Sequence, residues 1–253
     1  MNALFVGDVH NHMYMFNDVE KLDKKYNFDR IIFMGDYVDD WKTDNHQSLE
    51  TLDVVFTLKE TNPEKYTFLI GNHELSYMGF PCSGHHYELE DVMQMKLFEN
   101  IDKLDFYTEI KCGKDIFYCT HAGINAGYID GVLGGKDKWL DTLKEMNSNK
   151  LKSLQLLTPC SYLRGGISDF SSFVWADLRE HIMFQSDRPI IPNQIIGHTL
   201  VPNIKIIDNN YFIDTHSTYP DGKPYGDASY LMWNDNMFTI LNRNDIREEG
   251  VQW

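Results

Sequence analysis

The sequence predicts an α/β fold, and two features carry that prediction. Short apolar runs alternate with segments whose apolar residues recur at helical spacing, in the order strand, helix, strand, helix, strand over roughly the first 70 residues. This order favours parallel strands joined by right-handed crossovers. Several apolar runs also end in a glycine that is followed by Asp, Asn or His. Open α/β sheets present their binding sites at such strand ends.

The first three strands and two helices follow from this periodicity. Apolar runs predict strands over residues 1–10, 28–34 and 66–70. Apolar residues near helical spacing predict amphipathic helices over residues 13–26 and 49–59. The second helix is expected to stop near Asn62-Pro63, because proline cannot continue a helix.

The rest of the chain mixes both kinds of element. Residues 75–105 are predicted to be mostly helical, with an apolar stripe at Val92, Met95 and Phe98, and to sit over the site as a cap. A helix is expected over 139–157, and the long loop 161–172 is a candidate functional segment. Strands are predicted for two short pieces of 107–119 and, beyond residue 195, for 204–207, 211–214, 230–233 and 237–241.

Composition limits the class of protein. With 253 residues, 42% of them hydrophobic and 13% aromatic, the chain can bury a substantial core, and we expect a single domain over 1–253. The formal net charge of −15 argues against stable nucleic-acid binding and against an anionic membrane as the main partner. The four cysteines form no CxxC motif, which predicts reduced thiols in a cytoplasmic protein. We expect neither a signal peptide nor a membrane span.

Metal-capable side chains follow five of the apolar runs. None is a thiolate, and mixed oxygen and nitrogen donors suit manganese, iron or zinc better than copper(I). Six groups are too many for one open catalytic ion but suit two ions that share a bridging carboxylate. The six are Asp8, His10, Asp36, Asn72, His121 and His198. For any one of them alone, a capping Asp or a buried core His is the better explanation. Their shared position at strand ends favours the metal site for the set of six.

Five motifs give these residues a family context. They are GDVH, GDYVDD, GNHE, THAG and GHT, in this order between residues 7 and 199. Together they resemble the calcineurin-like metallophosphoesterase superfamily, and within it the phosphoprotein phosphatase branch with its small bacterial and bacteriophage serine/threonine phosphatases. The resemblance implies a layered β-sheet sandwich flanked by helices. It also implies a location in the bacterial cytosol, or in the host cytosol if the chain is phage-encoded.

The resemblance assigns roles to these residues. Asp8, His10 and Asp36 would hold the first of two divalent ions, with manganese preferred over iron or zinc. Asp36 would bridge to the second ion, which Asn72, His121 and His198 complete. The nucleophile would be a hydroxide that bridges the two ions. His73 would be the general acid, oriented and charged by Asp39, since a neighbouring carboxylate raises the pKa of an imidazole and fixes its tautomer.

Substrate binding is expected from Arg164 and Asn72. Arg164 precedes Val174-Trp175-Ala176-Asp177, which resembles a Trp-Ser-Asp stretch of the branch, and an Arg fork suits phosphate. An ordinary surface Arg is the alternative.

The sequence also departs from the branch. Asp40 stands where an Arg is usual, so one phosphate-binding cation is missing. Asn11 and His216 stand where Gly is usual or common, and His216 is a packed loop residue or a neighbour of the first metal or the substrate. The remaining histidines are expected to be structural or exposed, namely His12, His46, His85, His86 and His181.

Three functions compete. The first is a metal-dependent phosphomonoesterase acting on phosphoserine, phosphothreonine or a small phosphorylated metabolite. The second is a phosphodiesterase or dinucleoside polyphosphate hydrolase. Many diesterases carry Gly-His-x-His at the last motif, and Leu200 in that place favours the monoesterase, whereas the missing Arg favours a less charged diester. The third is a metal-binding scaffold without chemistry, against which the complete set of ligands and His73 argue.

Overall fold

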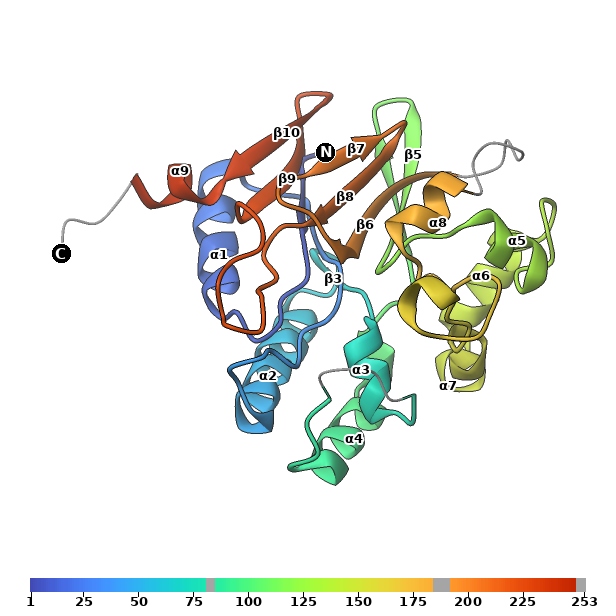
Figure 1. Ribbon diagram of the computed structural model, residues 1–253. Helices are drawn as coiled ribbons and strands as arrows, with labels where there is room; N and C mark the ends of the chain where they lie inside the picture. The colour runs from blue at the N-terminus through green and yellow to red at the C-terminus, as the bar shows by residue number, and fades with distance from the viewer. Residues whose placement is uncertain (81–84, 184–191, 249–253) are drawn as a thin grey trace.

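The computed structural model describes residues 1–80, 85–183 and 192–248. Within these residues the strands form two five-stranded sheets, ordered β10-β9-β1-β2-β3 and β4-β5-β6-β8-β7. Figure 1 shows both sheets in the upper part of the molecule and α2, α3 and α4 below them. The strands are β1 Ala3–Val6, β2 Arg30–Phe33, β3 Tyr66–Phe68, β4 Thr108–Cys112, β5 Asp115–Thr120, β6 Asn193–Leu200, β7 Lys205–Ile207, β8 Asn210–Asp214, β9 Ser229–Asn234 and β10 Met237–Asn242.

The N-terminal half of the first sheet has the predicted topology. β1 pairs with β2 and β2 with β3, both parallel, and the connections are helices α1 (Tyr14–Tyr26) and α2 (Asn45–Thr61). In the second sheet, β5, β6 and β8 are parallel neighbours. The α/β prediction is therefore confirmed, and the parallel strands direct their carboxyl ends to a common region.

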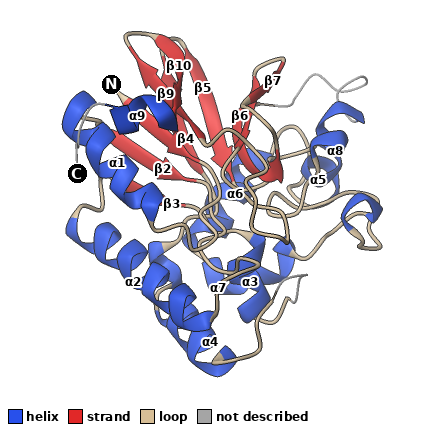
Figure 2. Ribbon diagram, turned by 60° about the vertical axis from the view of Figure 1, so that its left-hand side comes forward, coloured by secondary structure: helices blue, strands red, loops and turns tan. Residues whose placement is uncertain are grey.

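Alternating side chains of the first sheet contribute to two hydrophobic clusters, one on each face of the sheet. Ala3 and Phe5 of β1 pack in a cluster with residues of the second sheet, whereas Leu4 and Val6 pack with the residues of α1 and α2. Successive strand side chains point to opposite faces, so β1 serves the inter-sheet core and the helix-covered face at once. Figure 2 shows α1 and α2 beside the strands of this sheet.

Shorter helices cover the remaining surfaces. In the described part of the chain, no helix combines the length and the hydrophobicity needed to cross a bilayer. The helices after α2 are α3 Asn72–Tyr77, α4 Glu90–Glu99, α5 Ala126–Gly131, α6 Trp139–Ser148, α7 Lys150–Ser153, α8 Leu178–Met183 and α9 Arg243–Glu248, with 3₁₀ turns η1 Ile101–Lys103, η2 Leu154–Leu157 and η3 Tyr162–Arg164.

Several predicted boundaries were wrong. Helix α2 begins four residues before the expected start, because the Asp44 carboxylate accepts the backbone N–H groups of His46 and Gln47 as an N-cap. The single helix expected over 139–157 is broken near Asn149 into α6, α7 and η2. The helices α5, α8 and α9 were not predicted, and each has six described residues, too few for a clear period.

The segment 75–105 is less helical than expected. Helix α3 ends at Tyr77 and α4 begins at Glu90; the intervening residues that the structure describes lie outside helices. In α4, Met93 and Leu97 are buried, while the stripe of Val92, Met95 and Phe98 is exposed. Helix α4 contacts α2 and α3. The part of this segment that reaches the site is instead the loop carrying His85 and His86.

Candidate metal centre

The metal-capable residues predicted from the sequence lie in loops that follow strands of both sheets. Asp8 and His10 follow β1, Asp36 follows β2, and Asn72 is the first residue of α3, after β3. His121 follows β5 of the second sheet. His198 differs from the expectation, since β6 does not end at Ile196 but continues to Leu200 through an irregular register.

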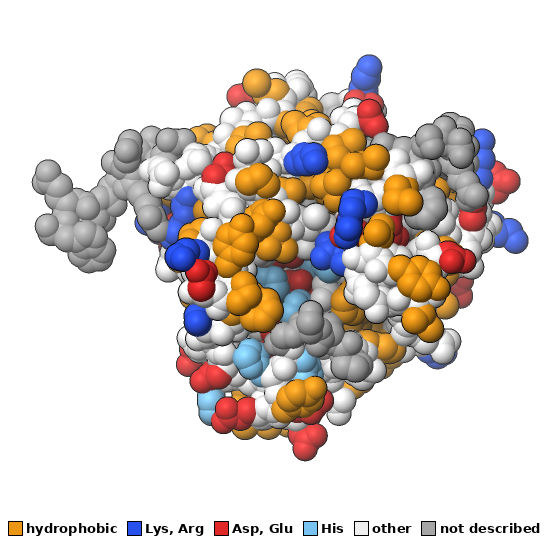
Figure 3. Space-filling view, in the orientation of Figure 1, with side chains coloured by type: hydrophobic (Ala, Val, Ile, Leu, Met, Phe, Trp, Pro, Cys, Tyr) orange, Lys and Arg blue, Asp and Glu red, His pale blue; other side chains and the backbone are white. Residues whose placement is uncertain are grey.

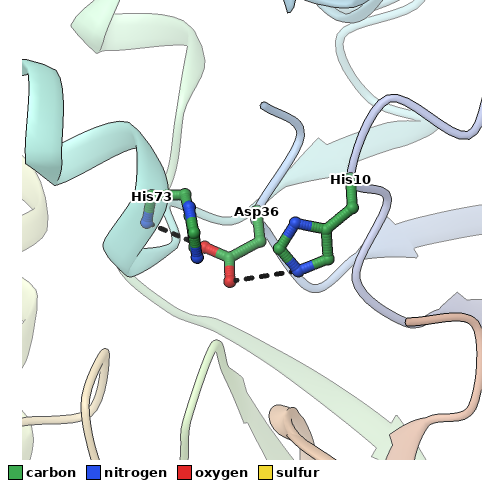
Figure 4. A group of neighbouring side chains, drawn as sticks. All are labelled: His10, Asp36 and His73. Atoms are coloured by element: carbon green, nitrogen blue, oxygen red, sulfur yellow. Dashed lines mark hydrogen bonds and ion pairs between the residues drawn. The ribbon is translucent and has the colours of Figure 1, made fainter. Parts of the chain in front are cut away.

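Asp36 is the central group of the site. Its Oδ2 lies 3.3 Å from Nε2 of His121 and 3.7 Å from Nε2 of His10, and its Oδ1 accepts the backbone N–H of His73 at 3.0 Å. Figure 4 shows the carboxylate between His10 and His73. A Cβ on Gly71 would lie 2.1 Å from Asp36 Oδ1, so only glycine allows this approach. Asp36 therefore has the position expected of a bridging ligand.

Two groups of residues share this carboxylate. We call Asp36, His121 and His198 the inner cluster, and His10, Asp36 and His73 the outer cluster. In each, the candidate ligand atoms lie within 4.8 Å of one another. All three inner residues are buried, whereas His10 and His73 are partly exposed. The structure thus brings four of the six predicted ligands together in these clusters, plus His73.

Backbone carbonyls set the tautomers of two histidines. His121 Nδ1 lies 2.8 Å from the Met34 carbonyl oxygen, and His10 Nδ1 lies 2.6 Å from that of Asp39. A neutral ring that donates from Nδ1 keeps a lone pair on Nε2, and in both rings Nε2 faces Asp36. This is the arrangement of metal-ligating histidines, whose second nitrogen is held by a carbonyl or carboxylate.

The inner cluster crowds groups that need a cation between them. Nε2 of His121 lies 3.1 Å from Nδ1 of His198 and 3.0 Å from Oδ1 of Asn72. A neutral His121 with its lone pair on Nε2 would face these two atoms and the Asp36 carboxylate, so either a proton on His121 or a metal ion has to lie among them. The mixture of imidazole nitrogen, amide oxygen and carboxylate oxygen is typical of manganese, iron and zinc sites. The residues present therefore fit a divalent ion.

Asp8 belongs to neither cluster. Both of its carboxylate oxygens accept the backbone N–H of His198, at 3.0 and 2.9 Å. Burial, together with the nearby negative charge of Asp214, raises the pKa of Asp8 well above its usual value. Asp214 ends β8 and is buried, and it was not among the predicted site residues. The signal was present, because Asp214 closes a predicted strand as the other site residues do.

Charge in the site is balanced between carboxylates and imidazoles. Burial alone would lower the pKa of His121, but Asp36 and Asp8 raise it to about 9. Burial would likewise raise the pKa of Asp36, and the neighbouring His121 and His73 instead hold it well below its usual value. Without a metal, the inner cluster is therefore organised around one ion pair between Asp36 and His121.

A buried tyrosine extends the predicted acid pair. His73 Nδ1 lies 2.9 Å from Asp39 Oδ2, as expected for an acid and its orienting carboxylate. The other oxygen of Asp39 accepts from the hydroxyl of Tyr77 at 2.5 Å. Tyr77 is fully buried, and nothing in its sequence context marks it as a site residue. Its position follows from α3, which carries His73 and Tyr77 four residues apart on one face.

A buried glutamate holds the strand-end loops together. Oε2 of Glu74 accepts the backbone N–H groups of Gly71 and Asp36, and Oε1 accepts that of Tyr37. The loop after β2 and the start of α3 are thereby fixed to one side chain. Asp36 needs such support, since its φ of 50° is a left-handed conformation. Glu74 belongs to the GNHE motif, but no role was predicted for it.

Arg164 lies beside the last motif. Its Nη2 donates to Thr199 Oγ1 at 2.8 Å, and its Nε lies 3.0 Å from Asp177 Oδ2. Glu180 fixes this region, because it accepts from the hydroxyls of Ser161 and Ser171, which flank the Arg164 loop. Arg164 is thus placed next to His198, whose pKa is lowered first by burial and then by the Arg164 charge.

Comparison with known protein families agrees with this geometry. The model of the calcineurin-like phosphoesterases matches residues 1–202. The chain belongs to this family. The resemblance noted in the sequence is thereby confirmed.

Two relatives of known name are serine/threonine phosphatases. A protein phosphatase 2A catalytic subunit of Dictyostelium discoideum is 28% identical over 127 residues, which are 47% of this chain and 38% of that protein. The protein phosphatase 6 catalytic subunit of Caenorhabditis elegans is 38% identical over 68 residues, 27% of this chain and 19% of that protein. This chain aligns with less than half the length of either relative.

Solved structures share the fold. A cold-active protein-tyrosine phosphatase of a Shewanella species has a TM-score of 0.60 at 16% identity, over 94% of this chain and 77% of that one. A protein serine/threonine phosphatase of Saccharomyces cerevisiae has a TM-score of 0.56 at 14% identity, over 95% of this chain and 79% of that one. The layered sandwich expected for a calcineurin-like phosphoesterase is thus confirmed.

The departures from the phosphatase branch have structural counterparts. Asp40 accepts from the hydroxyl of Thr218 at 2.9 Å, and its Oδ2 lies 3.8 Å from His12 Nε2. Burial opposes ionisation of Asp40, but these partners lower its pKa to about 2. His216 is buried against Tyr14 and Tyr230, the packed position that was one of its two expectations.

Proposed function

We propose that this chain is a metal-dependent phosphomonoesterase. The observation that carries the proposal is Asp36, whose carboxylate is shared by two clusters of imidazoles, beside the paired His73 and Asp39. Two divalent ions bound on one carboxylate can orient a phosphate group, neutralise its charge and activate water. Membership of the calcineurin-like phosphoesterases and the phosphatase relatives support the same assignment.

Each side of Asp36 would hold one ion. We assign Asp8 and His10 with Asp36 to the first ion, and Asn72, His121 and His198 with Asp36 to the second. Manganese is our choice for both, with iron or zinc next, because the donors are carboxylate, amide and imidazole without thiolate. The tautomers of His10 and His121 support this assignment, since both present Nε2 toward Asp36.

The chain itself would supply the proton and hold the phosphate. His73, held at Nδ1 by Asp39, presents its other nitrogen to the leaving oxygen and protonates it. Arg164 grips phosphate oxygens with its planar fork, assisted by the Asn72 amide. For Arg164, this role requires the guanidinium to exchange part of its contact with Thr199 for the phosphate.

One observation favours a second candidate, a phosphodiesterase. Asp40 places a negative charge at the cavity beside the metal centre, where the phosphatase branch has an arginine. A diester carries one negative charge fewer than a dianionic monoester and needs fewer cations. Against this, Leu200 occupies the place of the second His of many diesterases and lines the same cavity.

We also propose a cytoplasmic location and phosphorylated compounds as substrates. The thiols of Cys112 and Cys119 are buried and free, and burial raises the pKa of Cys112 to about 12. Such thiols persist in a reducing compartment.

Activity on two synthetic substrates tests the proposal. The full chain is treated with chelator, dialysed, and assayed with p-nitrophenyl phosphate and bis-p-nitrophenyl phosphate after addition of manganese, zinc or magnesium. We expect chelation to abolish hydrolysis of the monoester and manganese to restore it best. Full activity in excess chelator would overturn the two-ion proposal. Restored hydrolysis of the diester alone would establish the second candidate.

A further inference from the structure

A cavity beside the outer cluster has a composition that the phosphate chemistry does not explain. Its volume is 470 Å³, within the range of small-molecule sites. Its floor includes His10, His73 and Asp39 of the metal centre. Figure 3 shows histidines and acidic atoms in a hollow with large hydrophobic side chains around it. The leaving group of the hydrolysed phosphoester would therefore occupy this cavity.

Aromatic side chains form one wall of the cavity. Trp41, Tyr219 and Tyr225 line it, together with Pro220. Trp41 and Tyr219 are 54% and 47% exposed, and the rings of Tyr219 and Tyr225 lie 5.1 Å apart. Flat rings left exposed beside a reaction centre are suited to stack on a flat ligand.

Two loops that are distant in sequence make this wall continuous. The hydroxyl of Thr218 donates to Asp40, which ties the loop of Trp41 to the loop of Tyr219. The same loops meet again where a Cβ on Gly222 would lie 3.4 Å from Lys42 Cγ. The loop of Trp41 and the loop of Tyr219 therefore form the aromatic wall together, and two contacts between them hold it.

The charges that line the cavity favour a neutral leaving group over an anionic one. Among the described residues that line it, none is Lys or Arg, and both Asp39 and Asp40 are present. A polyphosphate tail or an acidic peptide would meet these carboxylates with no Lys or Arg of the lining to offset its charge. Hydroxyl and amino donors, in contrast, are accepted by carboxylates. The ligand should therefore be neutral, aromatic and rich in hydrogen-bond donors.

We propose that this cavity binds the nucleoside part of a nucleoside monophosphate, with the base against Trp41 and Tyr219 and the sugar hydroxyls toward Asp40. This inference rests on the proposed phosphomonoesterase function and narrows its substrate class. A nucleoside combines a flat base with neutral hydroxyl donors, and it joins the phosphate through an alkyl oxygen that His73 must protonate. The second nucleotide of a dinucleoside polyphosphate would bring charge that the cavity does not accommodate.

A matched pair of substrates tests the proposal on the manganese-loaded full chain. Adenosine 5′-monophosphate and 2-glycerophosphate both release an alcohol through an alkyl oxygen, so they differ mainly in the nucleoside. We expect kcat/KM to be at least about tenfold higher for the nucleotide. Trp41→Ala removes one stacking contact and should lower kcat/KM for the nucleotide at least about fivefold. The kcat/KM for 2-glycerophosphate should stay nearly unchanged. Phe98→Ala, an exposed aromatic on α4, should change neither.

Binding without chemistry gives a second readout. Adenosine carries no phosphate, and its calorimetric affinity should fall in Trp41→Ala and in Asp40→Leu but not in Phe98→Ala. Equal kcat/KM for the two substrates, or equal losses on both in Trp41→Ala, would overturn the proposal. So would O-phosphotyrosine with the same rate and the same sensitivity to Trp41, which would assign the wall to an aryl leaving group. If no monoester is hydrolysed, the proposed function fails, while adenosine binding still decides whether the cavity is a nucleoside site.

Discussion

The inner and outer clusters share Asp36 but differ in how they meet the surface. His121 and His198 of the inner cluster are buried among the strand ends of the second sheet. The side chains of His10 and His73 in the outer cluster are 15% and 16% exposed, and both line the cavity. We therefore expect both clusters to hold an ion, and only the outer cluster also to meet the substrate.

The largest expected effect comes from the residue common to both clusters. Asp36→Asn removes the shared charge, so both ions should be lost and turnover should fall by roughly 10⁴-fold or more. Metal content by elemental analysis and kcat on p-nitrophenyl phosphate check this. Asp53→Asn, at an exposed carboxylate of α2, is the control and should keep both. Two tightly bound ions per chain in Asp36→Asn would show that the bridge is misplaced.

The outer cluster alone is tested by His73→Ala. If His73 is the acid and not a ligand, both ions and the fold should remain. Turnover should fall by roughly 10²–10⁴-fold on phosphoserine. The loss should be much smaller on p-nitrophenyl phosphate, whose leaving group departs without a proton. His46→Ala, at an exposed histidine, is the matched control. Loss of an ion, or an equal fall in turnover on both substrates, would instead identify His73 as a metal ligand. Its place in the outer cluster also permits that role.

The inner cluster alone is tested by pH in the metal-free protein. Folding raises the pKa of His121 from 6.5 to about 9 through its carboxylate neighbours. A pKa raised by folding stabilises the folded chain below the unfolded value, and this contribution is lost as pH rises through about 9. The thermal midpoint of chelated protein should therefore fall by several degrees between about pH 6.5 and 9.5. Manganese affinity should rise over the same interval, since protons compete with the ion. A midpoint independent of pH would contradict the Asp36–His121 pair.

The smallest effect is expected behind the outer cluster. Tyr77→Phe removes one hydrogen bond to Asp39, so kcat on phosphoserine should fall by roughly three- to tenfold. In Asp39→Asn, kcat on phosphoserine should fall further, because this substitution also removes the charge beside His73. Tyr66→Phe, on β3, is the matched control and should have wild-type kcat. A Tyr77→Phe loss as large as that of His73→Ala would mean that Tyr77 does more than position Asp39.

The strand ends were predictable because their information is local. An apolar run that ends in Asp, Asn or His beside a glycine is recognised from neighbouring residues alone. Asp36, His121 and His198 do meet as the motif order implied. Asp214 also follows an apolar run, without an intervening glycine, and was not among the predicted site residues. The residues that act through distant contacts were not predictable. Tyr77 reaches Asp39 only because α3 packs behind the site, and Glu74 binds backbone groups that leave no pattern in the sequence.

The cavity wall shows the same limit at longer range. Trp41 and Tyr219 are separated by most of the chain, and only the fold places them around one volume. The face of α4 was misjudged for a related reason. Val92, Met95 and Phe98 have helical spacing, but Met93 and Leu97 are the residues buried in this helix, which contacts α2 and α3. Apolar spacing identifies a helix and does not by itself say which side is covered.

Several site residues have a positive φ, and this backbone conformation sets thermal stability against turnover. Asp36 and His198 have φ values of 50° and 61°, as do His10 and Asp39 at 43° and 60°. Such conformations carry a free-energy cost for side-chain-bearing residues, which glycine escapes. A library selected only for heat resistance should therefore accumulate glycine or asparagine at these positions and become inactive. Selection for turnover would keep them, and compensating substitutions would appear in the helices far from the strand ends.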